Sequence, residues 1–298
     1  SGEPVGYIMS FFNGTIPFSN FGSKNFDTLI PGCDKTHQVT MAVNFSALID
    51  FLHHNNVILC DINRGNVLID PKEIQVYLVD LDSAQIADQS YCYPSNVAVP
   101  EFLSPEHVYD EDFTFRRTKA DDIWIMQMLL FRMLTPNAEP MLSSEDVEDD
   151  RDLIRRGLYP YQGGKHRAEE AIRGTAWHQI VSRFPAYVKE MFWESFNGRG
   201  KFFPEKYVPA VRADPSRGIP GRPSTGRRNA RGWLNMMVRY QNDLPQMIRR
   251  DPEDGKLWPE GYRQYEPPNA VKIQGGSIEE LLKRYGGGGG STPWSSVK

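Results

Sequence analysis

The pattern of apolar and polar positions first predicts a helix in residues 39–52. Apolar side chains recur there at steps of three and four residues, as they do on one face of an α-helix. Asp50, His53 and His54 lie off this stripe, and the polar Asn55 marks the end of the helix. The stripe that we expect to be buried comprises Val39, Val43, Ala47, Leu48, Phe51 and Leu52.

Two short strands are predicted after this helix, with a polar loop between them. Residues 57–59 are an apolar run typical of a short buried strand. Residues 74–79 form a second run that contains β-branched and aromatic residues, which favour strands. The loop that joins the two runs begins near the end of the first strand, so its polar side chains are held by ordered structure on both sides.

Later segments of the chain again show helical spacing. Residues 119–134 open with polar residues and continue as an apolar core helix. Residues 143–157 begin with acidic residues and close with basic residues and a glycine, which is the charge order of a solvated helix. Residues 177–196 predict two short core helices on either side of Pro185, and residues 233–249 predict a final helix that covers the core.

Composition limits the classes of protein to which the chain belongs. Its 298 residues are 40% hydrophobic, which is enough for one large core, and the formal net charge is −4. A slightly acidic chain has no overall attraction to nucleic acid or to a membrane surface. The apolar run before Leu134 is interrupted by Gln127 and Arg132 and is shorter than the ~20 residues that span a bilayer. We therefore expect neither nucleic acid nor a membrane as a partner.

Three further features concern the compartment and the ends of the chain. The three cysteines lack Cys-x-x-Cys spacing and are expected to be free thiols in a cytoplasmic protein; they are Cys33, Cys60 and Cys92. Residues 201–232 carry scattered Arg among Pro and Gly, which favours a solvated loop over a nucleic-acid surface because few aromatic residues are interleaved. Residues 286–290 are all Gly and predict a flexible linker before a possible further domain.

The loop and the second strand carry the residues of a phosphoryl-transfer site. Residues 59–68 read LCDINRGNVL and contain Asp61 and Asn66, and Asp80 follows the second strand. In such a site one Asp orients and deprotonates a hydroxyl, while an amide oxygen and a second carboxylate hold magnesium on a nucleotide. Taken alone, Asp61 and Asn66 also fit an ordinary polar turn, because Asp, Asn and Gly are common turn residues.

Three downstream motifs provide the context that this pattern needs. Residues 100–106 read PEFLSPE, residues 122–124 read DIW, and residues 221–224 read GRPS. With these motifs in this order, the chain resembles the C-terminal lobe of a protein kinase, most closely a bacterial eukaryotic-like Ser/Thr kinase. The resemblance implies an α+β fold that is mainly α-helical, with short β-hairpins at the catalytic loop.

The resemblance also implies domain boundaries and the roles of individual residues. Residues 1–17 match the last strand of the N-terminal lobe and the hinge, residues 18–250 the C-terminal lobe, and residues 251–298 a polar tail. Asp61 matches the catalytic base of the family. ATP and Mg are the implied cofactors, bound by Asn66 and Asp80. The residues with implied structural roles are Glu106, which pairs with the late Arg222, and Asp122, which opens the core helix.

The sequence departs from the family pattern in four places. The Gly-rich loop, Lys and Glu of the strand lobe do not precede Phe18, so we expect a truncated product or fragment with little activity of its own. Cys60 replaces the Arg that clamps a phosphorylated loop, and Asn63 replaces a Lys in the catalytic machinery. Asp82 replaces the Gly of the Asp-Phe-Gly motif, where it is either a further metal ligand or the cap of the next turn.

Three functions remain open from the sequence. The first is ATP- and Mg-dependent phosphoryl transfer to Ser/Thr hydroxyls of a protein substrate. The second is phosphorylation of a small molecule by an aminoglycoside- or choline-type phosphotransferase, a reading that Asn63 and Asp82 favour slightly. The third is a non-catalytic pseudokinase scaffold. The intact set of Asp61, Asn66 and Asp80 argues against it, while the altered residues that flank this set argue for it.

Overall fold

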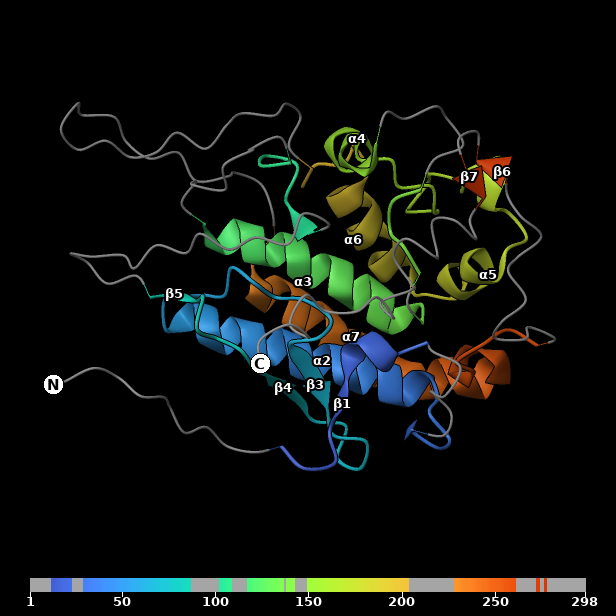
Figure 1. Cartoon of the computed structure of the whole chain (residues 1–298). Helices are drawn as coiled ribbons and strands as arrows, with labels where there is room; N and C mark the ends of the chain where they lie inside the picture. The colour runs from blue at the N-terminus through green and yellow to red at the C-terminus, as the bar shows by residue number, and fades with distance from the viewer. Residues whose placement is uncertain are drawn as a thin grey trace, which may run out of the picture.

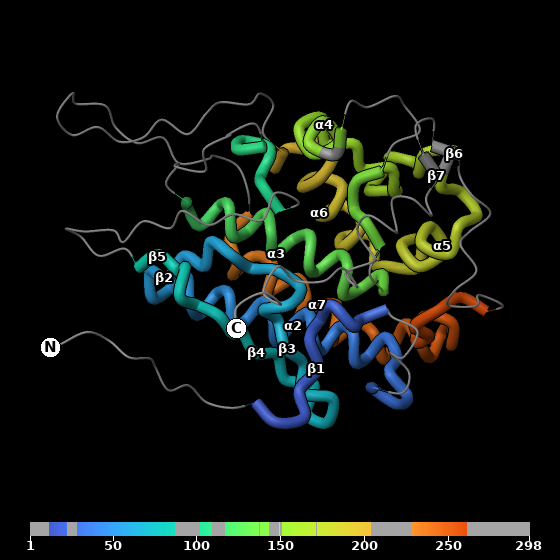
Figure 2. Tube along the Cα trace, in the orientation of Figure 1, coloured from blue at the N-terminus to red at the C-terminus, as the bar shows by residue number. Residues whose placement is uncertain are grey.

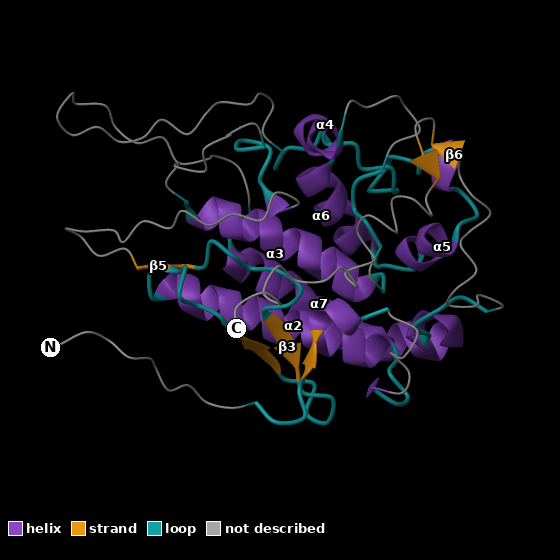
Figure 3. Cartoon of the chain, in the orientation of Figure 1, coloured by secondary structure: helices purple, strands orange, loops and turns teal. Residues whose placement is uncertain are grey.

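The computed structural model describes residues 12–22, 29–86, 102–108, 117–136, 138–142, 149–203, 228–260, 272–273 and 276–277. Within these ranges the protein is mixed α/β and mainly helical, with a few short strands (Figure 1 and Figure 3). This confirms the predicted predominance of helix. Residues 1–11 of the predicted N-terminal-lobe strand and hinge, and the predicted structural residue Arg222, lie outside the described residues, and the predicted domain boundaries stay predictions.

The helices are α2 (Lys35–His54), α3 (Lys119–Leu134), α4 (Asp150–Arg156), α5 (Ala176–Ser182), α6 (Ala186–Phe196) and α7 (Ala230–Arg250), with single 3-10 turns η1 (Phe18–Asn20), η3 (Glu170–Ile172) and η5 (Pro252–Gly255). The strands are β1 (Ile16–Pro17), β2 (Val57–Ile58), β3 (Val67–Ile69), β4 (Val76–Leu78), β5 (Gln85–Ile86), β6 (Lys272–Ile273) and β7 (Gly276–Ser277). No described helix is long and apolar enough to cross a membrane.

Helix α3 is the centre of the molecule. Every side chain from Asp121 to Leu134 is buried. Figure 2 shows α6 on one side of α3 and the pair α2 and α7 on the other, and α2 contacts both α3 and α7. A helix that is apolar all round is typical of a position enclosed on every side. The predicted bounds of this helix agree with the structure.

The strands place the polar loop at one edge of the helical core. Strands β3 and β4 form an antiparallel hairpin in which Leu68 lies opposite Tyr77, and β1 extends this sheet beside β3. Strand β2 pairs instead with β5. The loop between β2 and β3 therefore lies beside the end of β4, where Val79 N donates a hydrogen bond to Asn66 O at 3.0 Å.

Local sequence signals set the helix ends. Asp34 caps α2, with its side chain accepting from His37 N, and Thr118 caps α3 in the same way. Helix α4 ends at Gly157, whose φ of 62° is left-handed and where an added Cβ would lie 2.5 Å from a backbone nitrogen. Helices α5 and α6 are separated at Pro185, as predicted. These ends follow from residue types that the backbone requires.

The predicted buried face of α2 is partly wrong. Phe51 is 63% exposed, although it was assigned to the apolar stripe, and His53 is buried, although it was placed off the stripe. The buried face also includes Gln38 and Ser46. Polar groups can lie inside when they find hydrogen-bond partners, as Ser46 Oγ does by donating to Ala42 O. Hydrophobicity alone therefore did not locate this face.

The core between α3 and α6 is aromatic. Phe131 has no exposed surface, and its ring contacts four other aromatic rings at centroid distances of 5.1–6.3 Å; these belong to Tyr159, Tyr161, Phe192 and Phe196. Edge-to-face and tilted contacts of this kind add to the free energy gained by burial. Elsewhere in the described residues, Cys33 and Cys60 are free thiols, as predicted, while Cys92 lies outside them.

Phe131→Ala tests the dependence of the fold on this aromatic cluster. The substitution leaves a cavity, so we expect a loss of about 3–5 kcal/mol in the free energy of unfolding, measured by chemical denaturation. Phe51→Ala is the matched control, because Phe51 is a helical phenylalanine that is mostly exposed; its cost should stay within about 0.5 kcal/mol. Equal losses in the two variants would contradict the placement of the core.

Candidate active site

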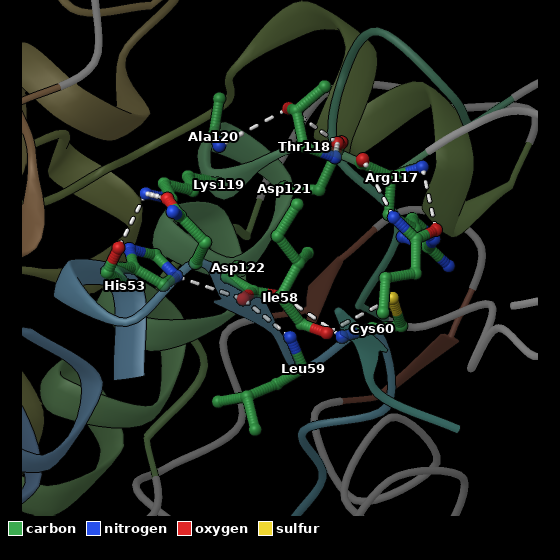
Figure 4. Close-up of polar contacts among 12 residues, drawn as sticks. His53, Ile58, Leu59, Cys60, Arg117, Thr118, Lys119, Ala120, Asp121 and Asp122 are labelled. Carbon is green, nitrogen blue, oxygen red and sulfur yellow. Dashed lines mark hydrogen bonds and ion pairs between the residues drawn. The ribbon is translucent and has the colours of Figure 1, made fainter. Parts of the chain in front are cut away.

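The loop that follows β2 is held by one buried carboxylate of α3. Asp122 has no exposed surface, and it accepts hydrogen bonds from Leu59 N at 2.7 Å and from Cys60 N at 3.1 Å. His53 Nε2 lies 2.9 Å from the same carboxylate (Figure 4). Lys119 adds a further tie from α3 to α2, because its Nζ donates to His53 O. The predicted structural residue Asp122 thus joins α2, α3 and the loop.

This carboxylate supports a backbone conformation that is otherwise unfavourable. Cys60 has a φ of 62°, which is in the left-handed region, and Asp61 N donates to Leu59 O at 2.6 Å in a tight turn. A non-glycine residue in this region costs free energy and persists only where its surroundings fix it. The two bonds to Asp122 flank this turn, so they determine the direction in which the chain enters Asp61.

Beyond Asp61 the loop is organised by two asparagines. Asn63 Oδ1 accepts from Gly65 N at 2.8 Å and from Asn66 N at 3.2 Å, while Asn63 Nδ2 donates to Asp61 Oδ1 at 3.2 Å. Asn66 Nδ2 donates to Asp61 O at 3.2 Å. That donation orients the Asn66 amide so that its oxygen, Oδ1, is turned away from the Asp61 backbone. The loop therefore fixes the side chains of Asp61 and Asn66 relative to each other.

Asp80 follows β4 and belongs to the same neighbourhood. It has a φ of 60°, so the chain turns sharply there. Partial desolvation raises the pKa of Asp80, and the charges of Asp82 and Asp61, with a hydrogen bond involving the Asp82 side chain, raise it further. Charges influence a pKa in this way only from nearby. The structure thus brings Asp61, Asp80 and Asp82 together, although they come from two different segments.

The oxygen atoms gathered here are of the kind that magnesium binds. Mg²⁺ takes oxygen ligands, usually one or two carboxylates together with substrate phosphates and water. Asn66 Oδ1 and the Asp80 carboxylate are oxygen atoms of this kind. In the part of the chain that the structure describes, no three His, Cys, Asp or Glu side chains are grouped to hold a metal ion by themselves. The residues fit a cation shared with a nucleotide better than a closed protein cage.

The remaining predicted site residues lie farther along the chain. Glu106 is buried in the segment of residues 102–108, and its expected partner Arg222 is outside the described residues. Their pairing stays a prediction. Cys60 is also buried, with its Sγ 3.6 Å from Ile58 O, so its thiol faces the protein interior.

Sequence reasoning missed a second buried carboxylate, that of Asp121. It accepts from Ser104 Oγ at 2.8 Å and from Thr118 N at 2.8 Å, and His107 Nε2 lies 3.5 Å away. Burial alone would raise the pKa of Asp121, but His107, Arg117 and these hydrogen bonds hold it below its ordinary value. Asp121 therefore ties the segment after residue 101 to the start of α3. Its only local signal is the capping pattern that begins with Thr118.

His53 and Gln85 were also missed. Gln85 Nε2 donates to Arg117 O at 3.1 Å, and Arg117 N donates to Gln85 Oε1 at 3.3 Å, which joins β5 to the chain before α3. Both residues act on partners that are distant in sequence, so no local spacing indicates them. The one signal that a sequence offers for such residues is a polar residue next to apolar residues that are expected to be buried.

Comparison with known proteins agrees with this geometry. The model of the protein kinase domain matches residues 32–192, which is more than half of the chain. The chain belongs to the protein kinase family. The predicted resemblance is therefore confirmed at the level of the family.

Two relatives of this kinase domain carry Ser/Thr-kinase or kinase-cascade names. One is serine/threonine-protein kinase dkf-2 of Caenorhabditis briggsae, 28% identical over 141 residues, which are 47% of this chain and 11% of that protein. The other is mitogen-activated protein kinase kinase kinase 17 of Arabidopsis thaliana, 24% identical over 126 residues, which are 42% of this chain and 32% of that protein. The match thus spans about a tenth and a third of the two relatives. The bacterial subfamily stays a prediction.

Asp122→Ala tests the anchor of the catalytic loop. The change leaves two buried backbone N–H groups without an acceptor, so we expect a loss of roughly 3 kcal/mol in the free energy of unfolding. Asp70→Ala is the matched control: Asp70 also accepts from two backbone N–H groups, those of Lys72 and Glu73, but at the surface. Water can replace this carboxylate, so its loss should be smaller. A larger loss for Asp70→Ala would contradict the anchoring role.

The crowding of Asp80 and Asp82 predicts a dependence of stability on pH. Because the pKa of Asp80 is raised in the folded protein, its stabilising contribution is present below the unfolded value of 3.8 and is lost as pH rises through the folded pKa. Asp82→Asn removes a neighbouring charge. We expect its Tm to exceed that of the wild type at neutral pH and to converge with it at acidic pH.

The control for this pH experiment is Asp70→Asn. Backbone N–H groups of Lys72 and Glu73 lower the pKa of Asp70, so its contribution is present above the unfolded value and is lost as pH falls. The control should therefore lower the Tm at neutral pH, which is the opposite sign. Thermal melting of the three proteins without divalent cations distinguishes these results. Identical Tm values for Asp82→Asn and wild type at neutral pH would count against the carboxylate cluster.

Proposed function

We propose that the protein that contains this kinase domain transfers a phosphoryl group from ATP, with magnesium, to Ser/Thr hydroxyls of protein substrates. The observation that carries this proposal is the pair of hydrogen bonds that joins Asp61 and Asn66 to the end of β4, directly before Asp80: Asn66 Nδ2 donates to Asp61 O, and Val79 N donates to Asn66 O. Phosphoryl transfer needs positioned oxygen ligands and an oriented acceptor hydroxyl more than it needs covalent chemistry by the protein.

In this proposal Asp61 receives the proton of the acceptor hydroxyl. Its Oδ1 is held by Asn63, and its other oxygen, Oδ2, is assigned to the hydroxyl. The left-handed turn at Cys60 and the bonds from Asp122 fix the backbone on which this carboxylate stands. A base that is held in place removes part of the entropic cost of aligning the reacting groups.

Asn66 and Asp80 are proposed to hold magnesium on the nucleotide. When bound, the ion supplies positive charge against the phosphate oxygens. Partial desolvation and the neighbouring charges of Asp82 and Asp61 raise the pKa of Asp80, and a bound cation would favour its charged form. Asp82 acts on Asp80, and no described contact shows it capping a backbone N–H, so we propose Asp82 as a supporting ligand rather than a turn cap.

Protein substrates are favoured over small molecules by the architecture after the catalytic loop. The segment of residues 102–108 is buried, and the hydrogen bond from Ser104 to Asp121 fixes its position on α3. The relative from Caenorhabditis briggsae is named as a Ser/Thr protein kinase. We therefore propose a Ser/Thr-containing polypeptide as the acceptor, in a cytoplasmic protein.

Asp61→Asn tests the proposed base. The variant keeps the shape of the side chain but cannot accept a proton, so we expect phosphoryl transfer from labelled ATP to a Ser/Thr peptide library to fall by about 10²-fold or more. Its Tm and its binding of ATP with magnesium should stay close to those of the wild type. The measurement uses the full natural protein.

The control is Asp70→Asn, a surface Asp in the turn between β3 and β4, which should retain the wild-type rate. Aminoglycoside and choline acceptors are assayed beside the peptides. If phosphoryl transfer occurs only to these alcohols, the substrate is a small molecule and the proposed protein substrate is wrong. Undiminished transfer by Asp61→Asn would remove Asp61 from the role of base, and ATP binding without transfer to any acceptor would indicate a scaffold.

A further inference from the structure

The Asn63 side chain makes hydrogen bonds in three directions within the catalytic loop. Its Oδ1 accepts from two backbone N–H groups, those of Gly65 and Asn66, and its Nδ2 donates to Asp61 Oδ1. One short side chain thus makes three hydrogen bonds, one to the proposed base and one to the backbone of a proposed metal ligand.

The backbone partners decide which way the Asn63 amide faces. An N–H group can only donate, so the atom that meets Gly65 N and Asn66 N must be the amide oxygen. The amide nitrogen is then the atom directed at Asp61 Oδ1, where a donor meets a carboxylate oxygen. A hydrogen bond to a charged acceptor is stronger than one between neutral groups. The orientation of the amide is therefore set by the loop itself.

These contacts argue against a role for Asn63 in neutralising phosphate charge. The side chain carries no charge, its oxygen is used by two N–H groups, and one hydrogen of its nitrogen is used by Asp61. A residue at this position that neutralised phosphate charge would need a free cationic group. The structure shows instead a neutral link between the turn and the Asp61 carboxylate.

We propose that Asn63 is a positioning residue, which holds Asp61 Oδ1 so that Oδ2 faces the acceptor hydroxyl. This inference rests on the proposed function, because it assigns Asn63 to the orientation of the proposed base. Asn63 also holds the backbone N–H of Asn66, so one side chain couples the direction of the base to the place of the proposed metal ligand.

A purely structural turn provides the contrast. Asn197, at the end of α6, makes a similar turn, since its Oδ1 accepts from Arg199 N at 3.0 Å. Its Nδ2 lies 3.4 Å from a neutral acceptor, Tyr159 O, and not from a carboxylate. Asn197 is therefore a control residue with the same turn and without a reacting partner.

The first variant is Asn63→Asp, which keeps an oxygen for the two N–H groups but places a second oxygen opposite Asp61 Oδ1. Repulsion then displaces the Asp61 carboxylate. We expect kcat for peptide phosphorylation to fall by at least about tenfold, as for other small misplacements of a catalytic group. KM for ATP with magnesium should stay within about twofold of wild type on the same reasoning, and Asn197→Asp should leave kcat unchanged.

The second variant, Asn63→Lys, separates positioning from phosphate contact. Lys is a cation with no acceptor atom, so it loses the two turn bonds and cannot reproduce the amide link. We expect kcat to fall. A rise in kcat would show that the position serves the phosphate, and it would overturn the proposal. An unchanged kcat in Asn63→Asp would overturn it as well.

An NMR measurement tests the link without relying on activity. In protein labelled with ¹⁵N-asparagine, Asp61→Ala should shift the side-chain NH₂ signals of Asn63 and leave those of Asn197 unchanged. Absence of a shift at Asn63 overturns the proposal even if the wild type is an active kinase. A wild type that binds ATP but phosphorylates no acceptor overturns the proposed function, and the catalytic role of Asn63 fails with it.

Discussion

The site depends on one interaction, the double hydrogen bond from the backbone of Leu59 and Cys60 to the buried carboxylate of Asp122. A charged group without exposed surface is stable only when its hydrogen-bonding capacity is used. Asp122 meets this condition with two loop N–H groups and His53, which come from segments distant in sequence. The carboxylate therefore fixes the loop to the most deeply buried helix, and the left-handed turn before Asp61 follows from that attachment.

The rest of the fold gives this carboxylate a rigid place. Helix α3 packs between α2 and α6, and aromatic side chains around Phe131 pack against it on one side. Close packing limits the movement of a core helix. At the same end of α3, Asp121 holds the segment of residues 102–108 through Ser104. Two adjacent carboxylates thus anchor the catalytic loop and the segment that we associate with the substrate.

The departures from the family pattern now have structural settings. Position 60 offers no cation to a phosphorylated loop, because it holds a cysteine, whose side chain is buried. The amide of Asn63 forms hydrogen bonds with the loop backbone and with Asp61. Asp82 adds a negative charge near Asp80. Relative to the family pattern, the site lacks the positive charges expected at positions 60 and 63 and gains the negative charge of Asp82. Such a site depends more strongly on a bound cation to balance its carboxylates.

The sequence by itself determined the features that arise from neighbours along the chain. The bounds of α3, the break at Pro185 and the stop at Gly157 follow from local backbone chemistry, and the spacing of Asp61, Asn66 and Asp80 indicated the chemistry of the loop. Only the tertiary structure decided that His53 and Asp121 are buried and that Phe51 faces solvent. Burial is a property of packing between distant segments: folding brings His53 to Asp122 and Ser104 to Asp121, pairings that no local pattern indicates.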